Sequence, residues 1–256
     1  MGQVALAVES YGVSHRGCVR QINEDRFLID ADSGIWLVAD GMGGHDSGEV
    51  ASASIVEHLA TVGTANSPRD LRARFEDRLS RAHEDIRKLS EARGETVGST
   101  IAALLAIDGS FACLWVGDSR IYLVRDGVIV QISHDHTEVQ ELLDRGVITS
   151  EEARYWPRRN VITRAVGVSE DVLIDYEQGK TLPGDIFVLA SDGLTAHVSD
   201  SEIRAAVLSA APQDACNALL ETVLSRGGTD NVTIVIVNIG AARAGKTAAR
   251  QGHKAP

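Results

Sequence analysis

Four short apolar stretches of this 256-residue chain each meet a turn at an aspartate. Short apolar runs bounded by glycine and aspartate are typical of buried strands. The runs and their aspartates are residues 35–39 with Asp40, 111–116 with Asp118, 186–190 with Asp192, and 232–237 with Asp230. The sequence therefore predicts buried strands whose acidic ends converge on one cleft.

Acidic side chains gathered in this way repel one another unless cations lie between them. Divalent cations such as Mg²⁺ and Mn²⁺ prefer the all-oxygen surroundings that carboxylates provide. A single Asp-Gly is an ordinary turn, but four acids in the same position on four strands favour a metal-dependent enzyme.

The composition is that of a globular protein, with 44% hydrophobic and 24% charged residues. The formal net charge of −11 argues against a nucleic-acid partner. We expect one domain over residues 1–240 and a disordered basic tail over residues 241–256.

The cysteines Cys18, Cys113 and Cys216 are far apart, so they predict neither disulfides nor a zinc site. We expect all three to be small buried side chains. There is no N-terminal apolar leader and no apolar stretch of about 18 residues, which predicts a cytoplasmic protein that is not membrane-bound.

Apolar positions three or four residues apart predict one long helix over residues 68–93, with Gly94 just beyond its end. In the segment before another predicted helix, over residues 137–145, either Asp135 or Thr137 is expected to be the cap. Further helices are predicted over residues 50–59, 201–209 and 213–226, and strands over residues 4–8, 27–29, 100–107, 111–116, 121–125, 128–132 and 232–239 and on both sides of Pro183-Gly184. Hairpins interrupted by two separate helical stretches predict an α+β fold with stacked sheets and helices outside.

Further motifs join the aspartates in a fixed order: the polar segment 17–25, the glycine-rich turn 40–45, Gly98-Ser99-Thr100, and residues 228–231. In this order and spacing, the chain resembles the bacterial metal-dependent protein phosphatases, the PPM or type-2C serine/threonine phosphatases. The resemblance runs from Arg20 to Asn231. It implies a four-layer α-β-β-α sandwich of two antiparallel sheets, with a metal centre at one edge that holds two or three Mn²⁺ or Mg²⁺ ions.

The same resemblance implies the ligands. Asp40 matches the acid that bridges two metals, and Gly41 matches the carbonyl ligand beside it. Asp192 and Asp230 match the remaining main ligands of one of these metals. Asp118 matches the acid that helps to hold a third metal, which it shares with Asp192.

Other matched residues lie around these ligands. Asp25 is expected to support the second metal through bound water, and Glu24 matches a ligand position of animal members. Arg20 matches the arginine that grips the substrate phosphate. Residues 155–167 match a mobile flap over the site.

The chain departs from the family pattern at Met42, where animal members have a histidine proposed as the general acid. His45 lies three residues later, and we expect it to make a polar contact between loop and helix. The identity of the proton donor is therefore open.

The resemblance implies hydrolysis of phosphoserine and phosphothreonine in proteins by metal-activated water. The expected partners are a bacterial Ser/Thr kinase and its substrates, and the expected state is a monomer. Growth control and type VI secretion remain alternative pathways. A catalytically weak phospho-binding module and a hydrolase of small phosphoesters are the competing functions.

Overall fold

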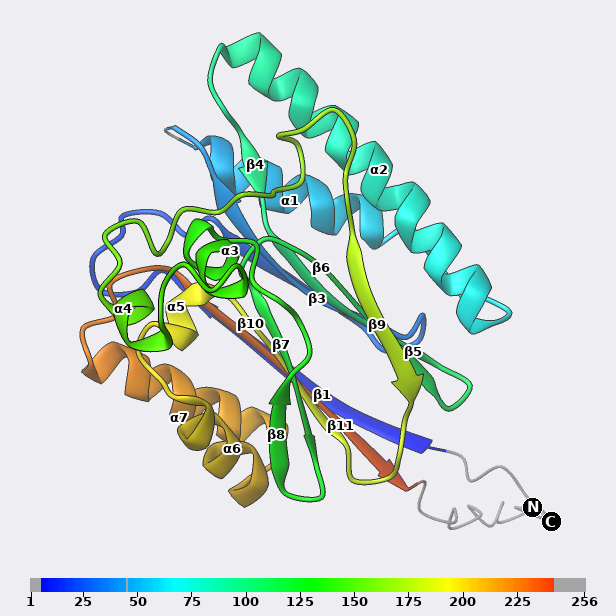
Figure 1. Cartoon of the computed structure of the whole chain (residues 1–256). Coiled ribbons are helices and arrows are strands. Elements are labelled where there is room, and N and C mark those ends of the chain that lie inside the picture. The colour runs from blue at the N-terminus through cyan, green and yellow to red at the C-terminus, as the bar shows by residue number, and fades with distance from the viewer. Residues whose placement is uncertain (1–5, 45, 242–256) are drawn as a thin grey trace, which may run out of the picture.

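The computed structural model of the chain describes residues 6–44 and 46–241, which form two antiparallel sheets stacked between two layers of helices (Figure 1). Helices α1 (Ser47–Leu59) and α2 (Pro68–Arg93) cover one sheet. Helices α6 (Asp200–Ser209) and α7 (Pro212–Ser225) cover the other. This arrangement confirms the predicted four-layer sandwich.

The five-stranded sheet has the first and last described strands side by side. Its order is β1 (Leu6–His15), β11 (Val232–Ala241), β10 (Ile186–Ala190), β7 (Arg120–Arg125) and β8 (Val128–Gln131). The six-stranded sheet comprises β2 (Asp25–Asp30), β3 (Ile35–Met42), β5 (Ile101–Ile107), β6 (Ser110–Val116) and β9 (Asp175–Lys180), with the short β4 (Gly98–Ser99) paired to β3.

The sandwich explains why several strands are apolar without alternation. In β3, Ile35 and Leu37 pack under the helices α1 and α2, whereas Trp36 and Val38 pack between the two sheets. Successive strand side chains point to opposite faces, and here both faces are covered. A third apolar cluster lies between the five-stranded sheet and helices α6 and α7.

Helix α2 has the predicted bounds because its ends are encoded locally. The hydroxyl of Ser67 accepts a hydrogen bond from the Asp70 N–H at the start, where Pro68 occupies the first turn. Gly94 ends the helix with a φ of 67°, a left-handed conformation that glycine adopts without strain. The predicted apolar face, including Leu71 and Phe75, is buried.

Short or polar elements differ from the sequence predictions. Strand β1 extends through His15 because it pairs with β11 over its whole length. Helix α1 starts at Ser47, three residues before the prediction. The prediction missed its first turn because the residues there are small and polar and show no apolar period. Helices α4 (Ser150–Arg154) and α5 (Asp192–Thr195) were not predicted, since four or five residues are too few to show a helical period.

The cysteine prediction is partly wrong. Cys113 and Cys216 are buried as predicted, but Cys18 is exposed in the loop after β1. Part of the strand predicted over residues 4–8, His45 and residues 242–256 of the predicted tail lie outside the described residues. No helix in the described part of the chain is long and apolar enough to cross a membrane.

One edge of the sandwich collects the acidic strand ends. Helix α5 and the short helices α3 (Glu138–Asp144) and α4 lie at this edge, whereas the described part of the chain begins and ends at the opposite edge (Figure 1). Helix α5 is held against the start of β11, where a Cβ atom on Gly193 would overlap the carbonyl oxygen of Asn231.

We predict that Gly193→Ala lowers the free energy of unfolding by about 1–3 kcal/mol, because the added methyl group forces α5 away from β11. Urea unfolding measures this loss. Gly240→Ala is the matched control, since its Cβ would lie 3.6 Å from the Ala7 carbonyl oxygen, an ordinary contact. Equal stability of the two variants would show that α5 is not held by this close approach.

Candidate metal centre

A cavity of about 310 Å³ opens at the edge where the acidic strand ends meet. Five acidic side chains from five separate segments line it, together with Arg20 and Gly41. The acids are Glu24, Asp40, Asp118, Asp192 and Asp230. The structure therefore brings seven of the eight predicted site residues to one cavity.

Hydroxyl groups fix the position of the turn that carries Asp40. The Asp40 N–H donates to Thr100 Oγ1 over 3.2 Å, and the Asp40 carbonyl oxygen accepts from the Thr100 N–H and from Ser99 Oγ. Thr100 Oγ1 lies 2.7 Å from Ser119 Oγ, next to Asp118 in the chain. One buried pair of hydroxyl groups thus connects the turns of two predicted ligands.

Asp25, the eighth predicted residue, lies beneath the cavity and is 1% exposed. It pairs with Asp40 across β2 and β3. Its Oδ2 accepts a hydrogen bond of 2.7 Å from Ser191 Oγ, and Ser191 Oγ in turn accepts from the Thr233 N–H. Its Oδ1 is buried and has no hydrogen-bond partner among the described residues.

Burial and crowding together raise the pKa values of these acids. Burial, reinforced by neighbouring carboxylates, raises the pKa of Asp118 to about 7 and those of Asp25 and Asp192 to about 6. Burial raises the pKa of Asp40 well above its usual range, and Asp25 and Asp192 add to the shift. The cavity therefore favours any positive charge that enters it.

The chemistry of the cavity fits hard divalent cations. All of its predicted ligands are oxygen atoms, and Glu24 Oε1 and Asp25 Oδ1 are buried without partners in the described part of the chain. No three His, Cys, Asp or Glu side chains of residues 6–44 and 46–241 form a ready-made metal site.

Arg20 lies at the rim and makes a contact that the sequence did not predict. Its Nη2 donates a hydrogen bond of 2.7 Å to Asp230 Oδ2, and the two side chains are 49% and 37% exposed. The guanidinium of Arg20 acts here as the counter-ion of a predicted metal ligand. It remains accessible to solvent, so a phosphate can still reach it.

Asn231 is a positioning residue that the sequence reasoning missed. Its Oδ1 accepts from the Glu24 N–H, and its Nδ2 donates to the carbonyl oxygens of Arg16 and Ile22. These three bonds hold the loop that carries Arg20 against the start of β11. Its sequence signal was its place directly after Asp230, at the end of the motif over residues 228–231, where we assigned it no role.

The segment predicted as a flap, residues 155–167, contributes Asn160 and Ile162 to the lining of the cavity. Thr137 is the N-cap of α3, accepting from the Gln140 N–H, so of the two predicted caps Thr137 is confirmed. Asp135 instead binds the guanidinium of Arg120 through both carboxylate oxygens.

Met42 also lines the cavity, and its described lining contains no histidine. The position that holds a histidine in animal members therefore offers no titratable group here.

We predict that Mn²⁺ raises the melting temperature by about 5–10 °C at a hundredfold excess over its Kd. The raised pKa values mean that the metal-free native state binds more protons than the unfolded chain, whose aspartates titrate near a pKa of about 4. This stabilisation is present below about pH 4 and is lost as the pH rises through about 6 to 7.

Cations replace these protons, so the gain from Mn²⁺ should be largest near pH 7.5 and should shrink towards pH 5.5. Differential scanning fluorimetry measures both effects. Asp40→Asn should reduce the Mn²⁺ shift, whereas Asp214→Asn, at an exposed aspartate of α7, should leave it unchanged. A shift that did not depend on pH would exclude these carboxylates as the site.

Comparison with known proteins agrees with this geometry. Residues 11–233 match the family described as protein phosphatase 2C. The chain is 36% identical over 241 residues to the serine/threonine protein phosphatase PstP of Mycobacterium tuberculosis, covering 93% of this chain but 46% of that protein. The chain thus spans about half the length of this curated relative.

Two solved structures are similar over nearly the whole chain. One is PppA, described as a key regulatory component of the type VI secretion system in Pseudomonas aeruginosa, with a TM-score of 0.84 and 39% identity over 91% of this chain and 97% of that one. The other is the catalytic domain of PstP in complex with two manganese ions, with a TM-score of 0.84 and 34% identity over 92% of this chain and 100% of that one. With the match over residues 11–233, these similarities show that the chain belongs to the protein phosphatase 2C family.

Proposed function

We propose that this chain is a metal-dependent phosphatase that hydrolyses phosphoserine and phosphothreonine in proteins. The observation that carries the proposal is the convergence of five carboxylates on one cavity with a guanidinium at its rim. The similarity to named serine/threonine phosphatases, one of them solved with two manganese ions, supports it.

The cavity residues divide into those that would hold cations and those that would support the holders. Asp40, the carbonyl of Gly41, Asp192 and Asp230 would hold two ions, and Asp118 would share a third with Asp192. Glu24 offers a further buried oxygen, and Asp25 would act from beneath through water. When bound, Mn²⁺ or Mg²⁺ supplies Lewis-acid chemistry that makes water nucleophilic near neutral pH.

Arg20 would bind the phosphoryl group of the substrate. Its guanidinium lies at the mouth of the cavity, half exposed, and its fork of N–H donors matches two phosphate oxygens. Charge that develops on the transferring group would be stabilised by this fixed donor. Asn231 would keep Arg20 in register with the acids by holding both sides of its loop.

The substrates would be phosphoproteins of a bacterial Ser/Thr kinase pathway, and the kinase itself would be one of them. A cytoplasmic monomer fits this role. The similarity to PstP and to PppA leaves growth control and type VI secretion as the two candidate settings.

The activity is tested with phosphoserine and phosphothreonine peptides in the presence of Mn²⁺. We expect release of inorganic phosphate that stops in excess chelator and returns on addition of Mn²⁺, because the proposed ligands are hard oxygens. A preference for small aryl phosphates over phosphopeptides would instead indicate a small-ester hydrolase. Full turnover without metal would exclude the mechanism.

Asp192→Ala should lower kcat more than Asp118→Ala, because Asp192 is proposed to contact two ions and Asp118 only the third. Removing one of several crowded acids relieves repulsion, so both variants should remain folded. Steady-state kinetics at saturating Mn²⁺, with circular dichroism as the folding control, separates the two. Wild-type kinetics for Asp192→Ala would remove Asp192 from the proposed centre.

Arg20→Ala should lower kcat/KM for a phosphopeptide by about 10–100-fold, the loss of charge-assisted hydrogen bonding worth about 1.5–3 kcal/mol in total. Arg20→Lys keeps the charge but loses the fork, so it should recover only part of the activity. Calorimetry should show almost unchanged Mn²⁺ affinity. Loss of metal binding with normal kinetics at saturating metal would falsify the assignment.

A further inference from the structure

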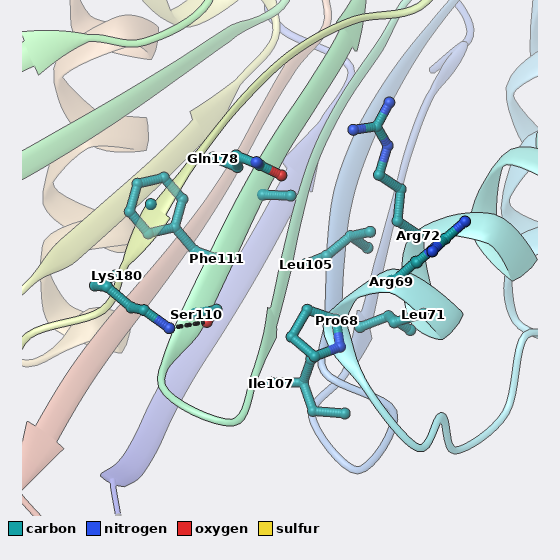
Figure 2. A pocket seen from close by; sticks show the side chains of 12 residues that line it. Pro68, Arg69, Leu71, Arg72, Leu105, Ile107, Ser110, Phe111, Gln178 and Lys180 are labelled. Carbon is teal, nitrogen blue, oxygen red and sulfur yellow. Dashed lines mark hydrogen bonds between the residues drawn. The ribbon is translucent and has the colours of Figure 1, made fainter.

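A second cavity, which we call the α2–β9 groove, lies on the outer face of the six-stranded sheet beside the start of α2 (Figure 2). Its volume is about 550 Å³. Its residues outside α2 include Leu105 and Ile107 of β5, Ser110 and Ala112 of β6, and Gln178 and Lys180 of β9.

The groove is separate from the metal centre. Strand β6 begins in the groove at Ser110 and ends at Val116, two residues before Asp118. Seven strand residues span about 20 Å. A molecule in the groove would therefore leave the cavity of the proposed reaction free.

Leu105 and Ile107 form the apolar floor of the groove. Two cations that have no carboxylate partner among the described residues flank this floor. Every other arginine and lysine of α2 forms an ion pair, but Arg69 forms none with the described residues. Lys180 donates a hydrogen bond of 2.9 Å to the hydroxyl of Ser110 and likewise has no acidic partner in the described part of the chain. Cations without an acidic partner are unexpected in a chain that has 36 acidic and 25 basic side chains and a net charge of −11.

Arg72 gives the α2 wall a fixed shape. Its guanidinium lies 3.4 Å from the ring centroid of Tyr176 in β9, and its Nε donates to Glu76 Oε1 over 2.7 Å. This stacked contact connects the helix to the edge strand. The groove is therefore formed by packed residues of both elements.

We propose that the α2–β9 groove binds an acidic peptide segment of a partner protein, with an apolar side chain on the floor and carboxylates beside Arg69 and Lys180. Figure 2 shows Lys180 on one side of Leu105 and Arg69 on the other. Cations on opposite walls suit several separated carboxylates along a chain better than one compact anion. The apolar floor favours a side chain such as leucine between them.

The proposal is tested by fluorescence anisotropy with a labelled peptide of repeated Glu-Glu-Leu triplets. We expect saturable binding to the wild-type chain that weakens as salt is added. A Glu-Glu-Ser peptide should bind less tightly because it lacks the apolar side chain, and a Lys-Lys-Leu peptide should not compete. Failure of the acidic peptide to bind, or equal binding of the basic one, would overturn the proposal.

The double variant Arg69→Glu/Lys180→Glu should weaken binding by at least about tenfold, because it places like charges beside the peptide. The matched control is Arg81→Glu/Lys88→Glu, which makes the same change in net charge at exposed sites of α2 outside the groove. Equal weakening in the control would mean that only net charge matters.

Hydrolysis of a small aryl phosphate by the groove variant should remain at the wild-type level. Anisotropy measures peptide binding without catalysis, so the binding result does not depend on the proposed phosphatase activity. A fall in that hydrolysis to the same extent as peptide binding would show that the substitutions disturb the fold or the metal centre, and would count against a separate docking groove.

Discussion

Repulsion between carboxylates crowded at one edge of the sandwich is the constraint on which the rest of the structure depends. Burial raises the pKa values of Asp25, Asp40, Asp118 and Asp192, and the charges of neighbouring carboxylates raise them further. They stay together because each is attached to a buried strand or to the turn beside one. Apolar burial on both faces of both sheets provides the free energy that holds them there.

Neutral hydroxyl groups, rather than counter-ions, hold several of these acids and their turns in position. The Ser191 hydroxyl stabilises the buried carboxylate of Asp25, and the Thr100 and Ser119 hydroxyls connect two acidic turns. Such groups orient the acids without neutralising them. The negative potential of the cavity is therefore preserved for a cation, whereas a lysine in the same place would have cancelled it.

The sequence was sufficient for the elements whose ends or periods are encoded locally. Helix α2 was predicted from its apolar spacing with Pro68 and Gly94 at its ends, and the strands beside the acids were predicted from their apolar runs. The gathering of the acids could be anticipated because each occupies the same place relative to its strand. The resemblance to a known family then indicated a role for each.

Tertiary contacts that have no local signal could not be predicted. Helix α5 is one turn held by the start of β11, and β1 is long because a distant strand pairs with it. The ion pair between Arg20 and Asp230 joins residues 210 positions apart. Asn231 likewise donates hydrogen bonds to a loop more than 200 residues away. Its neighbours in the sequence therefore could not indicate that it positions this loop.

The place of β11 between β1 and β10 has a consequence for how the molecule forms. This late strand pairs with β1, near the start of the chain, on one side and with β10 on the other. Strands β1 and β10 are themselves far apart in the sequence. Until it inserts, Asp230 and Asn231 are missing from the cavity, and β1 has no neighbour in its sheet. Contacts between such distant segments make for slow folding, because the loop between them must be closed first. A ribosome-bound chain that ends before residue 230 would therefore have three of the cavity's four aspartates and neither a complete sheet nor a site.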